Sequence, residues 1–177
     1  HYFDKLFGRT KLVEFSNTVL SPIKGSIPKT IKGTLFKNSP STIVRNGERV
    51  KYWFDGSGAI LKVDLSEGQA KASYKYVQTK VLKEEEKTNT HFTPNIVSLP
   101  SSYIKRLTRY FPNSSNKSNT SVLPLPGNKL LSLWEGGLPY LLNQDNLTTV
   151  GQTKLKGLNA LMTYSAHPKV DPETGEI

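Results

Sequence analysis

Short runs of β-forming residues, separated by turn sequences, recur along this chain of 177 residues. Between Tyr52 and Leu82, "AILKVDL" alternates apolar and polar residues, "SEGQ" supplies a turn, and "KASYKYVQTKVL" forms a second β-rich run. Hairpins of consecutive strands are typical of β-sandwiches and β-propellers. The pattern therefore predicts an all-β fold whose neighbouring strands pair antiparallel.

Two further hairpins are predicted in the second half of the chain. The turn residues Pro126, Gly127 and Asn128 separate strands expected at Val122–Leu125 and Lys129–Trp134. A third pair follows, in which "LPYLLN" and "LTTVGQT" flank the turn "QDN". The hairpins leave two polar segments, and we expect Lys83 to Lys87 ("KEEEK") to be a solvated connector and Asp55 to Gly58 to be a tight turn.

The composition restricts the partners and the chemistry. A net charge of +10 favours contact with an acidic partner, which would be nucleic acid or an anionic membrane surface. The cations are scattered rather than clustered, so nucleic acid, with Tyr74 and Tyr76 as stacking platforms, ranks last. The absence of cysteine excludes a disulfide scaffold, an Fe–S cluster, a thiolate zinc site and a cysteine nucleophile.

One segment has the pattern of a short amphipathic helix. In "PSSYIKRLTRYF", from Pro100 to Phe111, the apolar side chains recur with a spacing of three to four residues, and Ser101 and Ser102 suit a helix start. The apolar side is formed by Tyr103, Ile104, Leu107, Tyr110 and Phe111. Such a basic helix would either lie on a membrane surface or pack on its own β-domain.

Few residues suggest catalysis by themselves. His91 lies in a polar stretch that reads as a surface loop, and Pro168 biases His167 toward extended geometry at a strand or loop edge. A single histidine does not make a metal site, since a bound ion needs several ligands. Glu135 follows an apolar run and precedes two glycines, so its carboxylate would either face the interior with a partner or be exposed at a strand end.

Taken together, five blocks resemble the carotenoid cleavage oxygenase family, which includes the retinal pigment epithelium isomerase relatives. They follow the family's order, and the last two are the most specific. In sequence they are "GTLFKNSP" from Gly33, "YWFDGSGAI" from Tyr52, "NTSV" from Asn119, "LWEGGLPYLL" from Leu133 and "AHPKVDPETGE" from Ala166. The first resembles the family's GxLxRNGP and the second its HWFDGDGM, although Tyr52 replaces a histidine and Ser57 an aspartate.

The resemblance implies a seven-bladed β-propeller of which residues 1–177 are the N-terminal part, incomplete at the C-terminus. It implies one Fe²⁺ bound by four histidines, with His167 as the first. Glu135 matches a glutamate that orients a later histidine rather than His167. The implied reaction is the addition of O₂ across a double bond of a carotenoid, apocarotenoid or other polyene to give two carbonyl products, although some relatives cleave stilbenes and others isomerise.

Three hypotheses remain after this reading. The first is the N-terminal portion of an iron-dependent dioxygenase, inactive as an isolated segment because one ligand cannot hold the metal. The second is a truncated, non-enzymatic homologue that binds membrane or lipid, and the third is a basic β-domain that binds nucleic acid. The family also favours peripheral membrane contact by the 100–111 segment, and we expect a cytoplasmic or plastid protein.

Overall fold

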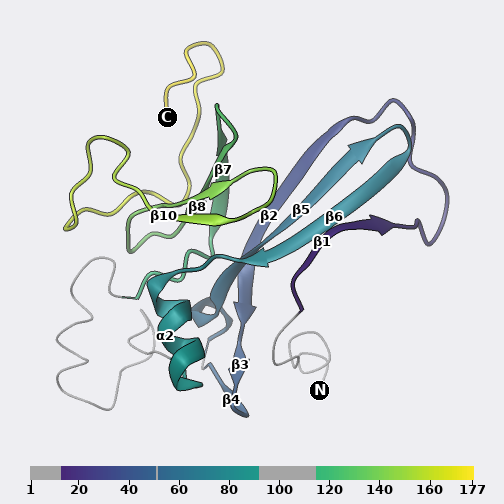
Figure 1. The fold of residues 1–177 in the computed structure, drawn as a ribbon. Coiled ribbons are helices and arrows are strands. Elements are labelled where there is room, and N and C mark those ends of the chain that lie inside the picture. The colour runs from purple at the N-terminus through teal and green to yellow at the C-terminus, as the bar shows by residue number, and fades with distance from the viewer. Residues whose placement is uncertain (1–12, 51, 92–114) are drawn as a thin grey trace.

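The computed structural model describes residues 13–50, 52–91 and 115–177, and most of them belong to two four-stranded antiparallel sheets (Figure 1). The strands of the first sheet lie in the order β1-β6-β5-β2. Their bounds are Phe15–Leu20 for β1, Gly33–Thr42 for β2, Ser57–Ser66 for β5 and Gln69–Tyr76 for β6. The hairpin predicted around "SEGQ" is therefore confirmed as β5 and β6, which pair from Ala59↔Tyr76 to Ser66↔Gln69.

The second sheet confirms the other two predicted hairpins. Its order is β10-β9-β8-β7. The strands are β7 at Ser121–Leu125, β8 at Lys129–Leu133, β9 at Tyr140–Asn143 and β10 at Thr149–Gln152. The turn between β7 and β8 suits its residues, because Gly127 and Asn128 have φ angles of 76° and 62°, a region that glycine and asparagine tolerate best. A small ladder pairs β3, Val44–Arg45, with β4, Glu48–Arg49.

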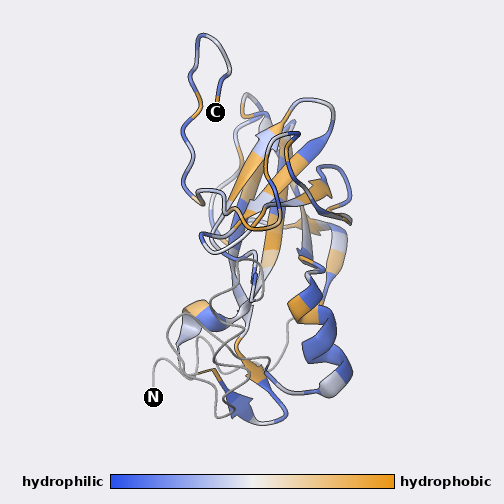
Figure 2. Ribbon diagram, turned by 90° about the vertical axis from the view of Figure 1, so that its left-hand side faces the viewer, coloured by the Kyte–Doolittle hydropathy of each residue, from blue (hydrophilic) through white to orange (hydrophobic). Residues whose placement is uncertain are grey.

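Apolar side chains from both sheets form the main core. The fully buried members come from β5, the segment after β6, and β8 to β10, and they are Ile60, Val77, Leu130, Tyr140, Leu142 and Leu147. Phe36 on β2 and Val122 on β7 pack against them. Figure 2 shows hydrophobic residues as orange bands along the strands of both sheets. The core thus joins the two sheets, and it brings β2 beside β7.

The sequence prediction is wrong between Thr79 and Thr88. The strand ends at Tyr76, and Lys80–Thr88 forms the helix α2 in place of the expected solvated connector. Thr79 caps the helix, since its hydroxyl accepts a hydrogen bond from the Leu82 backbone N–H at 3.0 Å. The helix buries Val81, Leu82 and Glu85 against the first sheet and exposes the other charged residues, so one face is enough to anchor it.

Glu85 is the centre of a buried charge cluster. Its carboxylate is fully buried, forms an ion pair with Lys117, and accepts a hydrogen bond from the Ser57 hydroxyl at 3.1 Å. The Arg45 guanidinium lies 3.8 Å away. Burial lowers the pKa of the Lys117 ammonium, and the Glu85 carboxylate opposes that shift. The cluster joins α2 to β5, to the β3 ladder and to the segment before β7.

The expected tight turn at Asp55 to Gly58 is only partly correct. Trp53–Asp55 forms a single 3₁₀ turn, and β5 already begins at Ser57. Gly58 is a strand residue whose backbone N–H donates to the Lys117 carbonyl at 2.8 Å. A Cβ atom on Gly58 would lie 2.0 Å from the Ser118 carbonyl oxygen. Glycine is therefore required here by close approach of two backbones.

The amphipathic segment predicted at residues 100–111 lies outside the described residues, so its helical form remains a prediction. Within the described ranges, no helix has the length and apolar character that crossing a bilayer requires.

Candidate functional site

The segment before β7 is buried and fixed by asparagine side chains. The Asn119 amide donates hydrogen bonds of 2.7 Å to the backbone carbonyls of both Phe54 and Gly56. The Asn116 amide donates to the Leu138 carbonyl at 2.8 Å. From β2, the Asn38 amide donates to the carbonyls of Ser118 and Ser121 and to the Ser132 hydroxyl. These bonds hold the 53–57 loop, the end of β2 and the start of β7 together.

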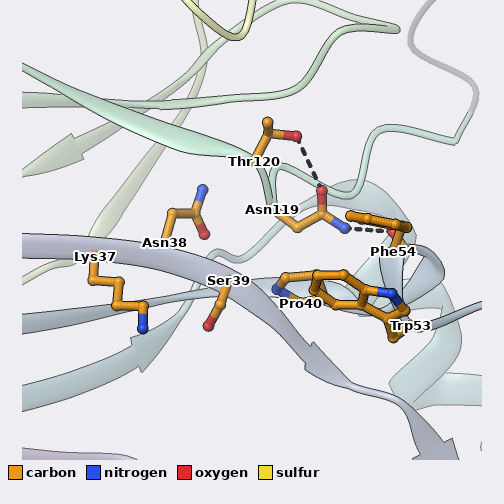
Figure 3. Close-up of a pocket in the computed structure, with 8 residues that line it drawn as sticks. All are labelled: Lys37, Asn38, Ser39, Pro40, Trp53, Phe54, Asn119 and Thr120. Atoms are coloured by element: carbon orange, nitrogen blue, oxygen red, sulfur yellow. Dashed lines mark hydrogen bonds between the residues drawn. The ribbon is translucent and has the colours of Figure 1, made fainter.

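A cavity of about 540 Å³ lies where these three segments meet (Figure 3). Its lining comes from β2, the 3₁₀ turn and the entry to β7, and consists of Lys37, Asn38, Ser39, Pro40, Trp53, Phe54, Asn119 and Thr120. The rings of Trp53 and Phe54 are in contact, with centroids 3.9 Å apart, and about half of each side chain is exposed. Large aromatic surfaces that the protein core leaves uncovered are typical of ligand-contacting walls.

His167 is held through its backbone. The preceding residue, Ala166, is fully buried against Leu131 and Leu133 of β8. Its carbonyl accepts a hydrogen bond from the Ser121 hydroxyl at the start of β7. The His167 backbone N–H donates to the Ser165 hydroxyl at 3.1 Å. The main chain before His167 is therefore anchored on the second sheet at Ser121, which directly follows Thr120 of the cavity lining. The imidazole is 72% exposed.

The carboxylate of Glu135 lies beside this imidazole. Glu135 Oε1 is 3.6 Å from His167 Nε2, a distance beyond a good hydrogen bond but within ion-pair range if the ring is protonated. Both side chains are more than half exposed, so of the two readings left open for Glu135, the exposed one describes its position. The structure brings together the two residues expected at the metal site, although Glu135 was expected to serve a later histidine.

The donor set fits part of an iron site. His167 offers a ring nitrogen, which is a common ligand for iron, and Glu135 can orient an imidazole. Within the described residues, no three histidine, aspartate or glutamate side chains gather in the arrangement that a bound metal needs. The described residues could therefore offer a metal one imidazole nitrogen, from His167, with the Glu135 carboxylate beside it.

His91 differs from the expected surface-loop histidine, because it is half-buried beside the charge cluster. Its Nε2 lies 3.1 Å from the Glu48 carbonyl, which fixes that nitrogen as the donor in the neutral ring. Burial lowers the pKa of His91, and the negative charge of Glu85 partly opposes that shift. This histidine therefore belongs to the structural cluster and lies apart from Glu135 and His167.

Comparison with known proteins shows which family this chain belongs to. A family model described as retinal pigment epithelial membrane protein matches residues 9–177. The chain belongs to this family. Among curated relatives, the apocarotenoid-15,15'-oxygenase of Synechocystis is 32% identical over 152 residues, covering 85% of this chain and 31% of that protein. The probable carotenoid cleavage dioxygenase 4, chloroplastic, of Arabidopsis thaliana is 30% identical and covers 88% of this chain and 30% of its own length.

The fold agrees with this assignment. A cobalt-substituted apocarotenoid oxygenase from Synechocystis superposes with a TM-score of 0.80 at 31% identity, covering 96% of this chain and 36% of that one. The two sheets are thus part of an all-β propeller, as the sequence predicted. The chain spans about a third of the length of the family members it matches.

The cavity was not predicted from the sequence. Lys37, Trp53, Phe54 and Asn119 each lie in a family block, but Lys37 and Asn119 are 82 positions apart in the sequence, and nothing in one chain shows that the blocks converge. The usable signal was compositional: three consecutive aromatic residues, Tyr52 to Phe54, precede Asp55 and Gly56 in a segment too polar to be a core strand.

Proposed function

We propose that this chain is the N-terminal part of a single propeller domain of an iron(II)-dependent dioxygenase that cleaves a double bond of a carotenoid or apocarotenoid. The observation that carries the proposal is the placement of His167. Its backbone is clamped between β7 and β8, its ring nitrogen is exposed, and Glu135 lies 3.6 Å away. An anchored backbone with an available imidazole is what a metal ligand requires.

Different residues of the chain would contact the metal and the substrate. His167 would supply one nitrogen to the metal, and Glu135 would limit the orientations of an imidazole at the site. Trp53, Phe54 and Pro40 would hold a flat, apolar polyene against the cavity wall and exclude water from it. Iron, when bound, would activate O₂ for addition to the double bond, so that both oxygen atoms end in the two carbonyl products.

Removing the proposed ligand tests the metal assignment. In the full-length protein, His167→Ala should lower the iron bound per molecule at least tenfold and abolish polyene cleavage. Glu135→Gln should reduce metal affinity or activity by roughly ten- to a hundredfold. Metal content is measured by mass spectrometry of the purified protein, and cleavage by loss of polyene absorbance.

Two exposed residues of the same C-terminal segment serve as controls. Lys169→Ala and Glu173→Gln remove a charge near the site without touching the proposed ligand, so both should retain wild-type iron. A His167→Ala protein that keeps its full iron content would refute the assignment. A wild-type protein without iron would favour the non-enzymatic alternative.

We further propose that residues 1–177 alone are inactive, because one histidine cannot retain ferrous iron. We place the protein in the cytoplasm or a plastid, and the relative named as chloroplastic supports the second location.

Membrane contact by the 100–111 segment is proposed from its sequence. Replacing Ile104 and Leu107 with serine should weaken binding of the full-length protein to anionic liposomes by about tenfold or more, because each aliphatic side chain would contribute to burial at the interface. Sedimentation with liposomes measures the effect. Ile23→Ser removes a fully exposed isoleucine elsewhere and should change nothing; equal binding by the double variant and the wild type would exclude this contact.

A further inference from the structure

The peptide bond between Ala166 and His167 is fixed at both of its polar groups. The Ala166 carbonyl accepts a hydrogen bond from the Ser121 hydroxyl at the start of β7. The His167 backbone N–H donates to the Ser165 hydroxyl at 3.1 Å. Because a peptide unit is planar, a donor on its carbonyl and an acceptor on its N–H determine how the plane is oriented. The two serine hydroxyls therefore determine where the Cα atom of His167 lies.

Two further features restrict the residues on either side of this peptide bond. The Ala166 side chain is fully buried against Leu131 and Leu133 of β8, which holds the segment on the second sheet. Pro168 disfavours a helical backbone at His167 and leaves extended conformations. The main freedom that remains to His167 is thus the rotation of its exposed side chain.

Ser121 is itself held in place from two neighbouring strands. Its carbonyl accepts a hydrogen bond of 3.0 Å from the Asn38 amide of β2. Its backbone pairs with Leu133 in the β7–β8 ladder. Ser121 also directly follows Thr120, which lines the cavity. One hydrogen-bonded segment therefore supports both the cavity wall and, through the Ser121 hydroxyl, the chain before His167.

The two serine hydroxyls differ in their exposure to solvent. Ser165 is exposed, so water competes for the His167 N–H and can replace the hydroxyl there. The hydrogen bond from Ser121 is part-buried, and its acceptor is the carbonyl of a residue whose side chain is fully buried. Removing that hydroxyl would take this donor from the Ala166 carbonyl at a place that water reaches less easily. Ser121 is therefore expected to contribute more than Ser165.

We propose that Ser121 is a positioning residue for the metal ligand: its hydroxyl holds the Ala166 carbonyl, so that the His167 imidazole is presented in one place. This inference rests on the proposed function for the identity of the group that His167 binds. Ser121 acts through the backbone of the next segment and not as a metal ligand. Without its hydroxyl, the segment would open locally more often, and the imidazole would be correctly placed for a smaller fraction of the time.

The metal affinity of the full-length protein tests this role. Co²⁺ is a suitable probe, because a cobalt-substituted form of the Synechocystis apocarotenoid oxygenase exists. Ser121→Ala should weaken Co²⁺ binding about three- to tenfold, the effect of losing one hydrogen bond to a backbone carbonyl. Ser121→Thr keeps a hydroxyl on a residue type that suits a β-strand, and it should bind Co²⁺ as the wild type does. Ser165→Ala should have a smaller effect than Ser121→Ala.

Hydrogen exchange of the metal-free, full-length protein tests the hydrogen bond without any metal. The reporter is the Tyr164 N–H, which donates to the Gly137 carbonyl at 3.2 Å. Peptides that contain residues 163–168 should exchange about three- to tenfold faster in Ser121→Ala than in the wild type or in Ser121→Thr. Thr79→Ala is the matched control, since it removes another buried hydroxyl, the cap of α2. It should change neither Co²⁺ binding nor the exchange of residues 163–168.

Three results would overturn the inference. They are wild-type Co²⁺ affinity in Ser121→Ala, equal losses in Ser121→Ala and Thr79→Ala, or a folded Ser121→Thr protein that behaves as Ser121→Ala does. Failure of the proposed function would look different. A wild-type protein that binds no Co²⁺ would refute the metal role of His167, while the exchange rates would still decide whether Ser121 holds its backbone.

Discussion

Replacing Glu85 with glutamine should destabilise the full-length protein by about 3–5 kcal/mol. The substitution keeps the shape of the side chain but removes the carboxylate paired with the Lys117 ammonium, which is 3% exposed, and leaves Asp55 as its remaining nearby negative charge. Arg45 would also lose its nearest described carboxylate. An uncompensated buried cation is costly, because water can no longer solvate it. Urea denaturation followed by circular dichroism measures the loss.

Two further variants identify the cause. The double variant Glu85→Leu with Lys117→Met removes both charges together and should recover much of the lost stability, since buried ion pairs can often be replaced by apolar groups. Glu84→Gln changes the preceding, exposed residue of α2 and should shift stability by less than about 0.5 kcal/mol. If the single Glu85 variant were as stable as the Glu84 control, the cluster would carry no net electrostatic stabilisation.

Adding one methyl group at Gly58 should cost about 3 kcal/mol or more, at the upper end of overpacking effects. The new Cβ would lie 2.0 Å from the Ser118 carbonyl oxygen and 2.9 Å from Asn119 Cα. Both contacts are backbone atoms, so relief requires the segment before β7 to move. That movement would disturb the Asn38 and Asn119 hydrogen bonds that frame the cavity. Thermal unfolding of the Gly58→Ala protein reports the change.

Gly157 provides the matched control. A Cβ there would meet no atom within 4 Å, and its backbone is outside the left-handed region. Gly157→Ala should therefore stay within about 0.5 kcal/mol of the wild type. Comparable losses at both glycines would mean that chain flexibility, and not the contact with Ser118, explains the requirement at Gly58.

The hairpins were predictable because local sequence determines them. The β7–β8 turn needs two residues with positive φ, and Gly127-Asn128 supplies them between alternating apolar runs. Helix α2 was missed for the opposite reason: its buried face has only Val81, Leu82 and Glu85, and the charged residues hide the period. Thr79, as the cap, and Asn89, with a left-handed φ of 51°, marked its two ends.

The site was only partly accessible from the sequence. His167 and Glu135 were found through family resemblance, and the structure places them 3.6 Å apart. Spacing alone cannot show that contact, because the residues are 32 positions apart and meet only when the chain after β10 returns to β8 (Figure 1). The burial of Glu85 could not be predicted for the same reason. A charged residue of "KEEEK" is expected in solvent, and the sequence does not show that the fold places its ion-pair partner Lys117 beside it.

The buried asparagines restrict how this protein can be synthesised. Asn116-Lys117-Ser118 and Asn119-Thr120-Ser121 both match the acceptor triplet for N-linked glycosylation. In the folded chain these asparagines are 2% and 5% exposed and their amide nitrogens donate to backbone carbonyls, so neither can carry a sugar. A chain that crossed the endoplasmic reticulum unfolded would risk modification at both positions and could then not close the segment before β7. Production in a cytosol, where oligosaccharide transfer does not occur, keeps both amides available for folding.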